Sequence, residues 1–318
     1  MHDLPVPPSL DPSPASRWLY ATALGTLLLT SLLVFVGGSV TSHDAGMAFP
    51  DAPLSNGWLV NPPGWLSEDK TRWEHGHRLV GSLVGIMAVT CVVIAFFVER
   101  RRWVRYVCIA ALFAVVGQGI MGIYRVRLAS IGLAMIHGVW GQLTFALLAC
   151  QALFSSAGWR YKLPVLDHAS AGSVRRSSLM VVGALLVQLS LGAGSRHFGS
   201  FGVLIFHIWW GVTTAVLIGR LVLLILGEAT GNPWTQRAAV LLGGLTALQL
   251  ALGLMAFVIT GGSSRRVLSP TFIQWFFPTL HVVTGSMVLA CSSLVCALCH
   301  RTMRASPTQE PELLAAQC

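Results

Sequence analysis

Long runs of apolar residues alternate with short polar segments along most of this chain. A helix needs about 20 mainly apolar residues to cross the hydrocarbon core of a bilayer, and each run is close to that length. The runs occur at residues 19–40, 78–98, 104–124, 131–154, 177–195, 203–226, 237–260 and 273–299. The pattern therefore predicts an all-α integral membrane protein with eight transmembrane helices.

Composition and charge agree with a membrane protein. The chain is 54% hydrophobic and only 10% charged, whereas a soluble domain carries about 25% charged residues. The net charge of +9 does not indicate nucleic-acid binding, because the basic residues are scattered at the ends of the spans. They gather between the second and third spans, between the fourth and fifth, and after the eighth. By the positive-inside rule, both termini are cytoplasmic and the loop 41–76 is outside.

The spans also show an internal repeat. A segment containing glutamine and glycine precedes a span that begins with a histidine at three places, around Gln118, Gln188 and Gln249. We interpret these glutamines as helix-packing residues. The repeat predicts two pseudo-symmetric four-helix bundles. The expected units are a cytoplasmic tail (1–18), an N-terminal bundle (19–154), a cytoplasmic linker (155–176), a C-terminal bundle (177–299) and a second cytoplasmic tail (300–318).

Four histidines near the starts of spans share the frame His-x-x-x-Gly. They are His77 with Gly81, His137 with Gly141, His207 with Gly211, and His281 with Gly285. A glycine four residues after a histidine lies one turn away on the same helical face, so a flat macrocycle bonded to the imidazole could lie against bare backbone. The even spans run inward, which puts all four rings at the outer side with two in each bundle. Such a pair suits haem iron, which takes one nitrogen on each face.

Other interpretations of these histidines stay open. Zinc is a weaker fit, because neither half shows third and fourth ligands. A single intramembrane histidine is more often a satisfied polar contact or part of a proton relay. His75 could compete with His77 as a ligand, whereas His43 and His197 are expected to be loop residues.

Arginines at the outer ends of spans run against the positive-inside trend. They are Arg125, Arg127, Arg196, Arg265 and Arg266. A guanidinium group can bind a haem propionate with two parallel hydrogen bonds, and we expect such contacts from Arg125 and Arg127 in one half and from Arg265 and Arg266 in the other. Snorkelling to the membrane interface is the alternative.

Glu74 is the only acidic residue next to a histidine frame. A carboxylate beside one pair of rings and not the other indicates proton-coupled chemistry in the N-terminal half, so Glu74 is the candidate catalytic residue. The alternative is a carboxylate that stabilises the start of a helix.

The run from Glu74 to Gly81, the segment from Gly37 to Gly57 and the three later histidine frames resemble the haem A synthase family. The resemblance covers most of residues 20–299 and implies two four-helix bundles. It implies that haem O is oxidised at its C8 methyl group, through hydroxylation, to the formyl group of haem A. It also implies that His207 and His281 hold a resident haem b, that His77 and His137 flank the substrate haem O, and that Glu74 lies near the reacting site.

The resemblance extends to surroundings and partners. It implies a location in the cell (cytoplasmic) membrane, a haem O synthase that supplies the substrate, and an electron acceptor in the membrane; a homo-oligomer is left open. The sequence departs from many members at one point, because Phe49 and Ser55 stand where those members carry a cysteine pair in the first outer loop. A non-catalytic dihaem cytochrome that exchanges electrons with quinone is the main alternative, and a haem transporter is a weaker one.

Overall fold

A computed structural model describes residues 14–160, 166–168, 170–227, 233–262 and 269–305. This part of the chain contains eight helices long and apolar enough to span a membrane. They are α1 (Pro14–Ser42), α2 (Asp69–Val98), α3 (Arg102–Arg127), α4 (Ile131–Ser155), α6 (Ala171–Phe198), α7 (Phe201–Gly227), α8 (Pro233–Ile259) and α9 (Phe272–Thr302). Each predicted span lies within one of them, except that the seventh was expected to run one residue past Ile259. The all-α membrane fold is confirmed.

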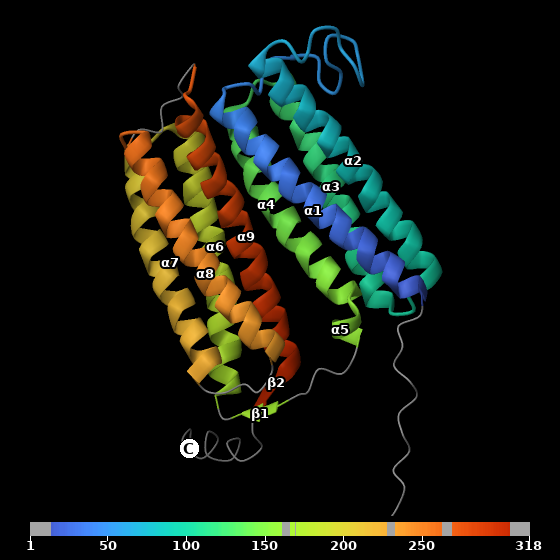
Figure 1. Ribbon diagram of the computed structural model, residues 1–318, viewed down its shortest axis with the longest axis vertical. Coiled ribbons are helices and arrows are strands. Elements are labelled where there is room, and N and C mark those ends of the chain that lie inside the picture. Colours follow the sequence, from blue (N-terminus) through green and yellow to red (C-terminus); the bar gives the residue numbers. More distant parts are fainter. Residues whose placement is uncertain (1–13, 161–165, 169, 228–232, 263–268, 306–318) are drawn as a thin grey trace, which may run out of the picture.

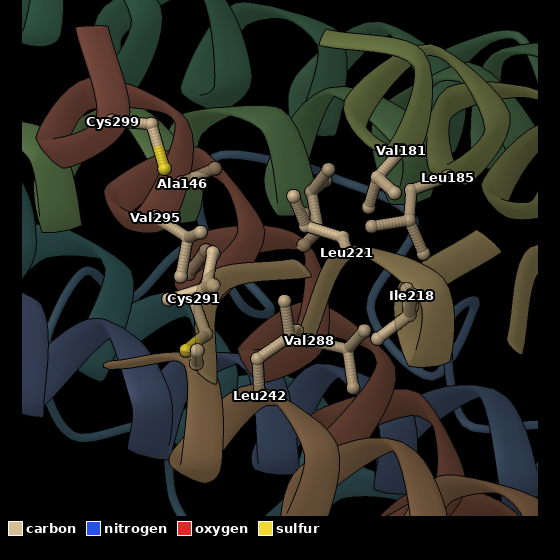
Figure 2. Packing of buried hydrophobic residues seen from close by; sticks show 14 of the residues in the cluster. Ala146, Val181, Leu185, Ile218, Leu221, Leu242, Val288, Cys291, Val295 and Cys299 are labelled. Atoms are coloured by element: carbon tan, nitrogen blue, oxygen red, sulfur yellow. The ribbon is translucent and has the colours of Figure 1, made fainter. Parts of the chain in front are cut away.

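The helices form two groups that lie side by side (Figure 1). Helices α1 to α4 make up one group and α6 to α9 the other, while α1 and α4 pack on α9, and α4 also packs on α6. One hydrophobic core joins the groups, since Phe145, Ala146 and Ala149 of α4 belong to the same cluster as residues of α6 to α9. Figure 2 shows part of this cluster, with Val181, Leu221, Leu242 and Val288 lying together. The division into two pseudo-symmetric bundles stays a prediction.

Short elements occupy the expected linker and the start of the expected second tail. The linker contains a single helical turn, α5 (Ala157–Arg160), and a strand, β1 (Leu166–His168). Strand β1 pairs in parallel with β2 (Met303–Ala305), which follows α9 directly. The sequence analysis predicted no strand here, and α9 extends to Thr302 although the tail was expected from residue 300. Three-residue strands carry too little alternation to be recognised in a sequence.

A buried ion cluster joins the α2–α3 turn to α5. Glu99 is 1% exposed and accepts hydrogen bonds from Arg101 Nη2 and Arg160 Nη2, each at 2.8 Å. Burial alone would raise the pKa of Glu99, but the hydrogen bonds from Arg101 and Arg160 lower it to about 2. The cluster therefore holds an ionised carboxylate at the end of the molecule opposite the first long loop.

The long loop between α1 and α2 has a defined conformation. Ser55 and Trp58 form a β-bridge, and the carboxylate of Asp51 accepts hydrogen bonds from the backbone N–H groups of Asn56 (3.0 Å) and Gly57 (2.7 Å). Asn56 and Gly57 have φ angles of 51° and 81°, and only glycine adopts the left-handed region without steric cost. These contacts hold the loop in one place beside the start of α2.

Candidate functional site

The four frame histidines meet in two pairs. The rings of His77 (α2) and His137 (α4) have centroids 6.3 Å apart and planes inclined at 71°. The rings of His207 (α7) and His281 (α9) have centroids 6.2 Å apart and planes inclined at 87°. The pairing predicted from the sequence is thus present in both groups of helices, with nearly the same separation.

Each ring lies against bare backbone of a neighbouring helix. An ideal Cβ atom built on the facing glycine would come unusually close to the Cε1 atom of the ring. The four contacts are Gly37 with His77 (2.9 Å), Gly122 with His137 (3.3 Å), Gly192 with His207 (2.8 Å) and Gly253 with His281 (2.9 Å). A side chain at any of these glycines would push the ring from its position.

The frame glycines themselves have a different role from the expected one. Gly141, Gly211 and Gly285 do not border a space beside the rings; an ideal Cβ there would lie 2.9 to 3.1 Å from a glutamine Nε2 atom. The amides concerned belong to Gln118, Gln188 and Gln249. Each glutamine precedes a ring-facing glycine by one turn, so Gln-x-x-x-Gly on one helix meets His-x-x-x-Gly on the next. The glycines make room for the amides.

The glutamines also contact the histidines of the next helix, in agreement with their interpretation as packing residues that hydrogen-bond across helices. Gln118 Nε2 donates to the backbone oxygen of His137 at 2.9 Å. Gln188 Nε2 lies 3.5 Å from His207 Nε2, and Gln249 Nε2 lies 3.3 Å from His281 Nε2. At the corresponding place on α1 stands Leu33, one turn before Gly37, and its Cδ1 atom lies 3.9 Å from an ideal Cβ on Gly81. Gly81, in the frame of His77, is therefore the one frame glycine that faces leucine instead of glutamine.

The ring nitrogens have few protein partners. His207 Nδ1 lies 3.2 Å from the backbone oxygen of Gln188, a contact that favours the proton on Nδ1 and leaves Nε2 as the nitrogen able to bind a metal. The Nδ1 atoms of His77, His137 and His281 are buried and make no hydrogen bond. Buried polar atoms without partners are rare, and a bound water or ion is one way in which such atoms are satisfied.

The side chains of Glu74 and Arg78, both on α2, form hydrogen bonds with the first loop, which joins α1 to α2. Glu74 is 2% exposed; its Oε1 atom accepts from Arg78 Nη2 at 2.6 Å and its Oε2 atom accepts from the backbone N–H of Phe49 at 2.9 Å. Arg78 also donates to the carbonyl oxygens of Phe49 (2.7 Å) and Leu54, and to Ser55 Oγ (3.2 Å). Both carboxylate oxygens of Glu74 are thus engaged with groups that position the loop.

His75, also on α2, binds the same loop. Its Nδ1 atom lies 2.8 Å from Ser55 Oγ and its Nε2 atom 2.8 Å from the backbone oxygen of Val60. Both nitrogens contact the loop, so His75 does not compete with His77. The sequence analysis noted Phe49 and Ser55 only for lacking thiols, and the structure shows that both residues are held by the Glu74, His75 and Arg78 side chains.

The outer arginines bind backbone oxygens. Arg125 Nη2 donates to Gly46 at 3.2 Å and Arg127 Nε donates to Ala52 at 2.8 Å, so both contact the first loop. Arg265 and Arg266 lie outside the described residues. Arg196, at the end of α6, donates from Nη2 to the backbone oxygen of Gly38 at 3.0 Å and to Ser42 Oγ at 2.8 Å.

Two histidines expected in loops are packed against helices. His43 follows α1 directly and is buried, with its ring stacked on Trp73 at a centroid distance of 5.2 Å. His197 lies in the last turn of α6, and its Nε2 atom is 3.7 Å from an ideal Cβ on Gly138. His197 and Arg125 line a cavity of about 100 Å³ at this end of α3 and α4.

Comparison with known proteins supports the resemblance seen in the sequence. The family model COX15-CtaA, described as cytochrome oxidase assembly protein, matches residues 66–198. The matched stretch runs from the end of the first loop to the end of α6, so it includes Glu74, His77 and His137 but not His207 or His281. A search of curated proteins finds no match to the chain.

Proposed function

Because residues 66–198 match a family of cytochrome oxidase assembly proteins, we propose that this protein is a haem A synthase. In this reaction haem O is hydroxylated at its C8 methyl group and oxidised further to the formyl group of haem A. The observation that carries the proposal is the presence of a histidine pair in each group of helices, with the loop contacts of Glu74 and the Leu33 side chain at only one of the two pairs.

The ring separations fit an iron atom between each pair. Two metal–nitrogen bonds of about 2 Å, together with about 1 Å from each ring nitrogen to its ring centre, give a centroid separation of roughly 6 Å. Within the described residues, no group of three or more His, Cys, Asp and Glu side chains could hold an ion by itself. This favours a metal whose remaining ligands come from a macrocycle, and it disfavours a closed zinc site.

We assign the resident haem b to His207 and His281. Both rings are backed by glycines and both contact a glutamine amide, so neither has room to turn away. Haem b, when bound, would supply a one-electron acceptor inside the protein. His207 would present Nε2 to the iron because Nδ1 faces the oxygen of Gln188.

We assign the substrate, haem O, to the space between His77 and His137. The surroundings of this pair differ from those of the other pair, since Leu33 replaces a glutamine and the first loop is anchored beside it. His77 and His137 would orient the macrocycle. Arg125, one turn after the glycine that backs His137, would bind a propionate, and Arg127 would do so beside it. Glu74 would act on the reaction by keeping the loop in place through Phe49 and Arg78, so we propose a positioning role for the predicted catalytic carboxylate.

The environment of the protein follows from the same proposal. Eight apolar helices make it a multi-pass membrane protein. We propose the cell membrane as its location with both termini in the cytoplasm, on the charge distribution of the loops. The substrate would arrive from a haem O synthase and the electrons would pass to an acceptor in the membrane.

A non-catalytic dihaem cytochrome is the second candidate, because the two ring pairs have almost equal separations. In a symmetric electron carrier we would expect the two pairs to have the same surroundings. Here Leu33 and the loop contacts of Glu74 occur only at the pair formed by His77 and His137. The difference between the two sites favours the enzyme.

Expression in a host that lacks its own haem A synthase tests the proposal. The purified wild-type protein should contain haem b together with haem O or haem A, and the host should form haem A. His207→Ala and His281→Ala should remove the low-spin haem b spectrum, whereas His77→Ala should retain it and stop haem A formation. His43→Phe serves as a control, since within the described residues the buried His43 ring packs on Trp73 and Trp275 and not on a frame histidine. Haem b without haem A formation by wild-type protein would favour the electron carrier.

A further inference from the structure

Arg196 occupies an unusual position between the two groups of helices. It lies on α6 one turn after Gly192, whose backbone backs the ring of His207. Its guanidinium donates to Gly38 O and Ser42 Oγ, both on α1 of the other group. Ser42 Oγ lies 3.0 Å from Thr279 Oγ1 on α9, two residues before His281. Arg196 therefore stands where α1, α6 and α9 meet beside the C-terminal pair of rings.

The charge of Arg196 has no anionic partner among the described residues. All of its hydrogen bonds within that part of the chain come from Nη2 and go to neutral oxygens. A guanidinium carries five N–H donors in a planar fork, and a half-buried cation at membrane depth is costly unless it pairs with an anion. The remaining donors are suited to a carboxylate, which Arg binds through two parallel hydrogen bonds.

Arg196 also has a counterpart at the other pair of rings. Arg125 lies one turn after Gly122, whose backbone backs His137, just as Arg196 lies one turn after Gly192. In each pair, one ring is thus backed by a glycine that is followed, about one turn later on the same helix, by an arginine.

We propose that Arg196 binds a carboxylate of the group held between His207 and His281, with Gly38 and Ser42 of α1 holding the guanidinium in position. The inference rests on the proposed haem site. It means that the N-terminal group of helices completes the C-terminal site, and that Arg196 performs there the role expected of Arg265 and Arg266.

A comparison of two macrocycles tests the proposal. Iron protoporphyrin IX carries two carboxylates, and its dimethyl ester carries none but has the same ring and iron. Full-length protein with His77→Ala and His137→Ala would confine binding to the C-terminal pair, and affinity for both compounds would be measured by spectral titration. We expect this protein to bind the diacid about tenfold or more tightly than the ester, since a hydrogen bond to a charged group is typically worth that much.

Arg196→Gln should remove most of this preference while leaving binding of the ester nearly unchanged. Arg196→Lys, which retains a charge but not the fork, should keep part of it. Arg220→Gln is the matched control, because Arg220 lies on α7 near Ser177 (3.4 Å) and should not affect the preference. The proposal is overturned if Arg196→Gln keeps the full preference for the diacid. If neither compound binds, or if His281→Ala leaves binding unchanged, the haem assignment itself fails and this inference fails with it.

Discussion

The rings of His207 and His281 lie 6.2 Å apart and nearly perpendicular to each other, and each is backed by the bare backbone of a different helix. His207 packs on Gly192 of α6 and His281 packs on Gly253 of α8. The position of each ring is therefore set by a residue that has no side chain. A binding site of this kind should be sensitive to one added methyl group.

Alanine at the ring-backing glycines should weaken haem b binding. In Gly192→Ala the new Cβ would lie 2.8 Å from His207 Cε1, and in Gly253→Ala it would lie 2.9 Å from His281 Cε1, so the ring must move. Changes that reorient a metal ligand typically cost about 10–100-fold in affinity, and we expect a loss of that size in haem b titrations. Gly183→Ala, also on α6, has open space around the new methyl group and should bind haem b normally. Equal affinity in all three variants would show that the rings do not depend on these glycines.

Glu74→Gln should loosen the first loop and lower haem A formation without affecting haem b. The variant loses the charge that pairs with Arg78 at 2.6 Å. We expect faster proteolysis within residues 50–66, an unchanged haem b spectrum, and a loss of activity of about tenfold or more, since breaking a buried ion pair is strongly unfavourable.

The reciprocal variant separates positioning from catalysis at Glu74. If the two residues act together, Arg78→Gln should have a similar effect and the double variant should be no worse than either single one, because their effects are coupled. A carboxylate with its own chemical role would instead make Glu74→Gln much more damaging than Arg78→Gln, with the loop still protected from protease.

The sequence was informative where a pattern is local to one helix. Hydropathy located every span, and the His-x-x-x-Gly frames identified the four rings that meet in pairs. The partner pattern was not visible, because Gln118-x-x-x-Gly122 gains its meaning only when α3 is known to face α4. For the same reason the glycines after the histidines were assigned to a macrocycle, although Gly141, Gly211 and Gly285 accommodate glutamine amides.

The contacts of the first loop could not be predicted from the sequence either. Glu74 next to a frame was recognised as unusual, but its two partners, Arg78 and the N–H of Phe49, became evident only from the fold of the loop. Arg196 was among the outer arginines for which propionate binding was considered, although the contacts of the C-terminal half were assigned to Arg265 and Arg266 after the seventh span. It acts from α6, where the contact with α1 depends on how the two groups of helices pack.

The proposed oxidation of haem O should need no thiol chemistry. The described residues include six free cysteines, of which Cys91, Cys108, Cys291 and Cys299 are buried; Cys318 lies outside them. Full replacement of all seven by Ala should preserve the conversion of haem O to haem A, with a stability cost of about 1 kcal/mol at each buried site. Thiol alkylation of folded wild-type protein should not inhibit it. A cysteine-free variant that binds haem b but makes no haem A would contradict this expectation.

Glu99 should make the stability of the protein depend on acid. Its pKa is lowered to about 2 in the folded protein from an ordinary value of 4.5, so the unfolded chain takes up the proton first as the pH falls. The stabilisation is fully present above pH 4.5 and is lost between pH 4.5 and pH 2; a shift of this size corresponds to about 3 kcal/mol.

Glu99→Gln should therefore lower the unfolding temperature at pH 7, because Arg101 and Arg160 would keep their charges beside a neutral amide. Between pH 4.5 and pH 2 the wild-type protein should lose stability faster than the variant, and the two curves should converge. Glu68→Gln is the control, since Glu68 is exposed and makes no side-chain cap bond at the start of α2. Thermal unfolding in detergent across this pH range measures the effect, and parallel curves for wild-type protein and Glu99→Gln would show that the cluster does not hold an ionised carboxylate.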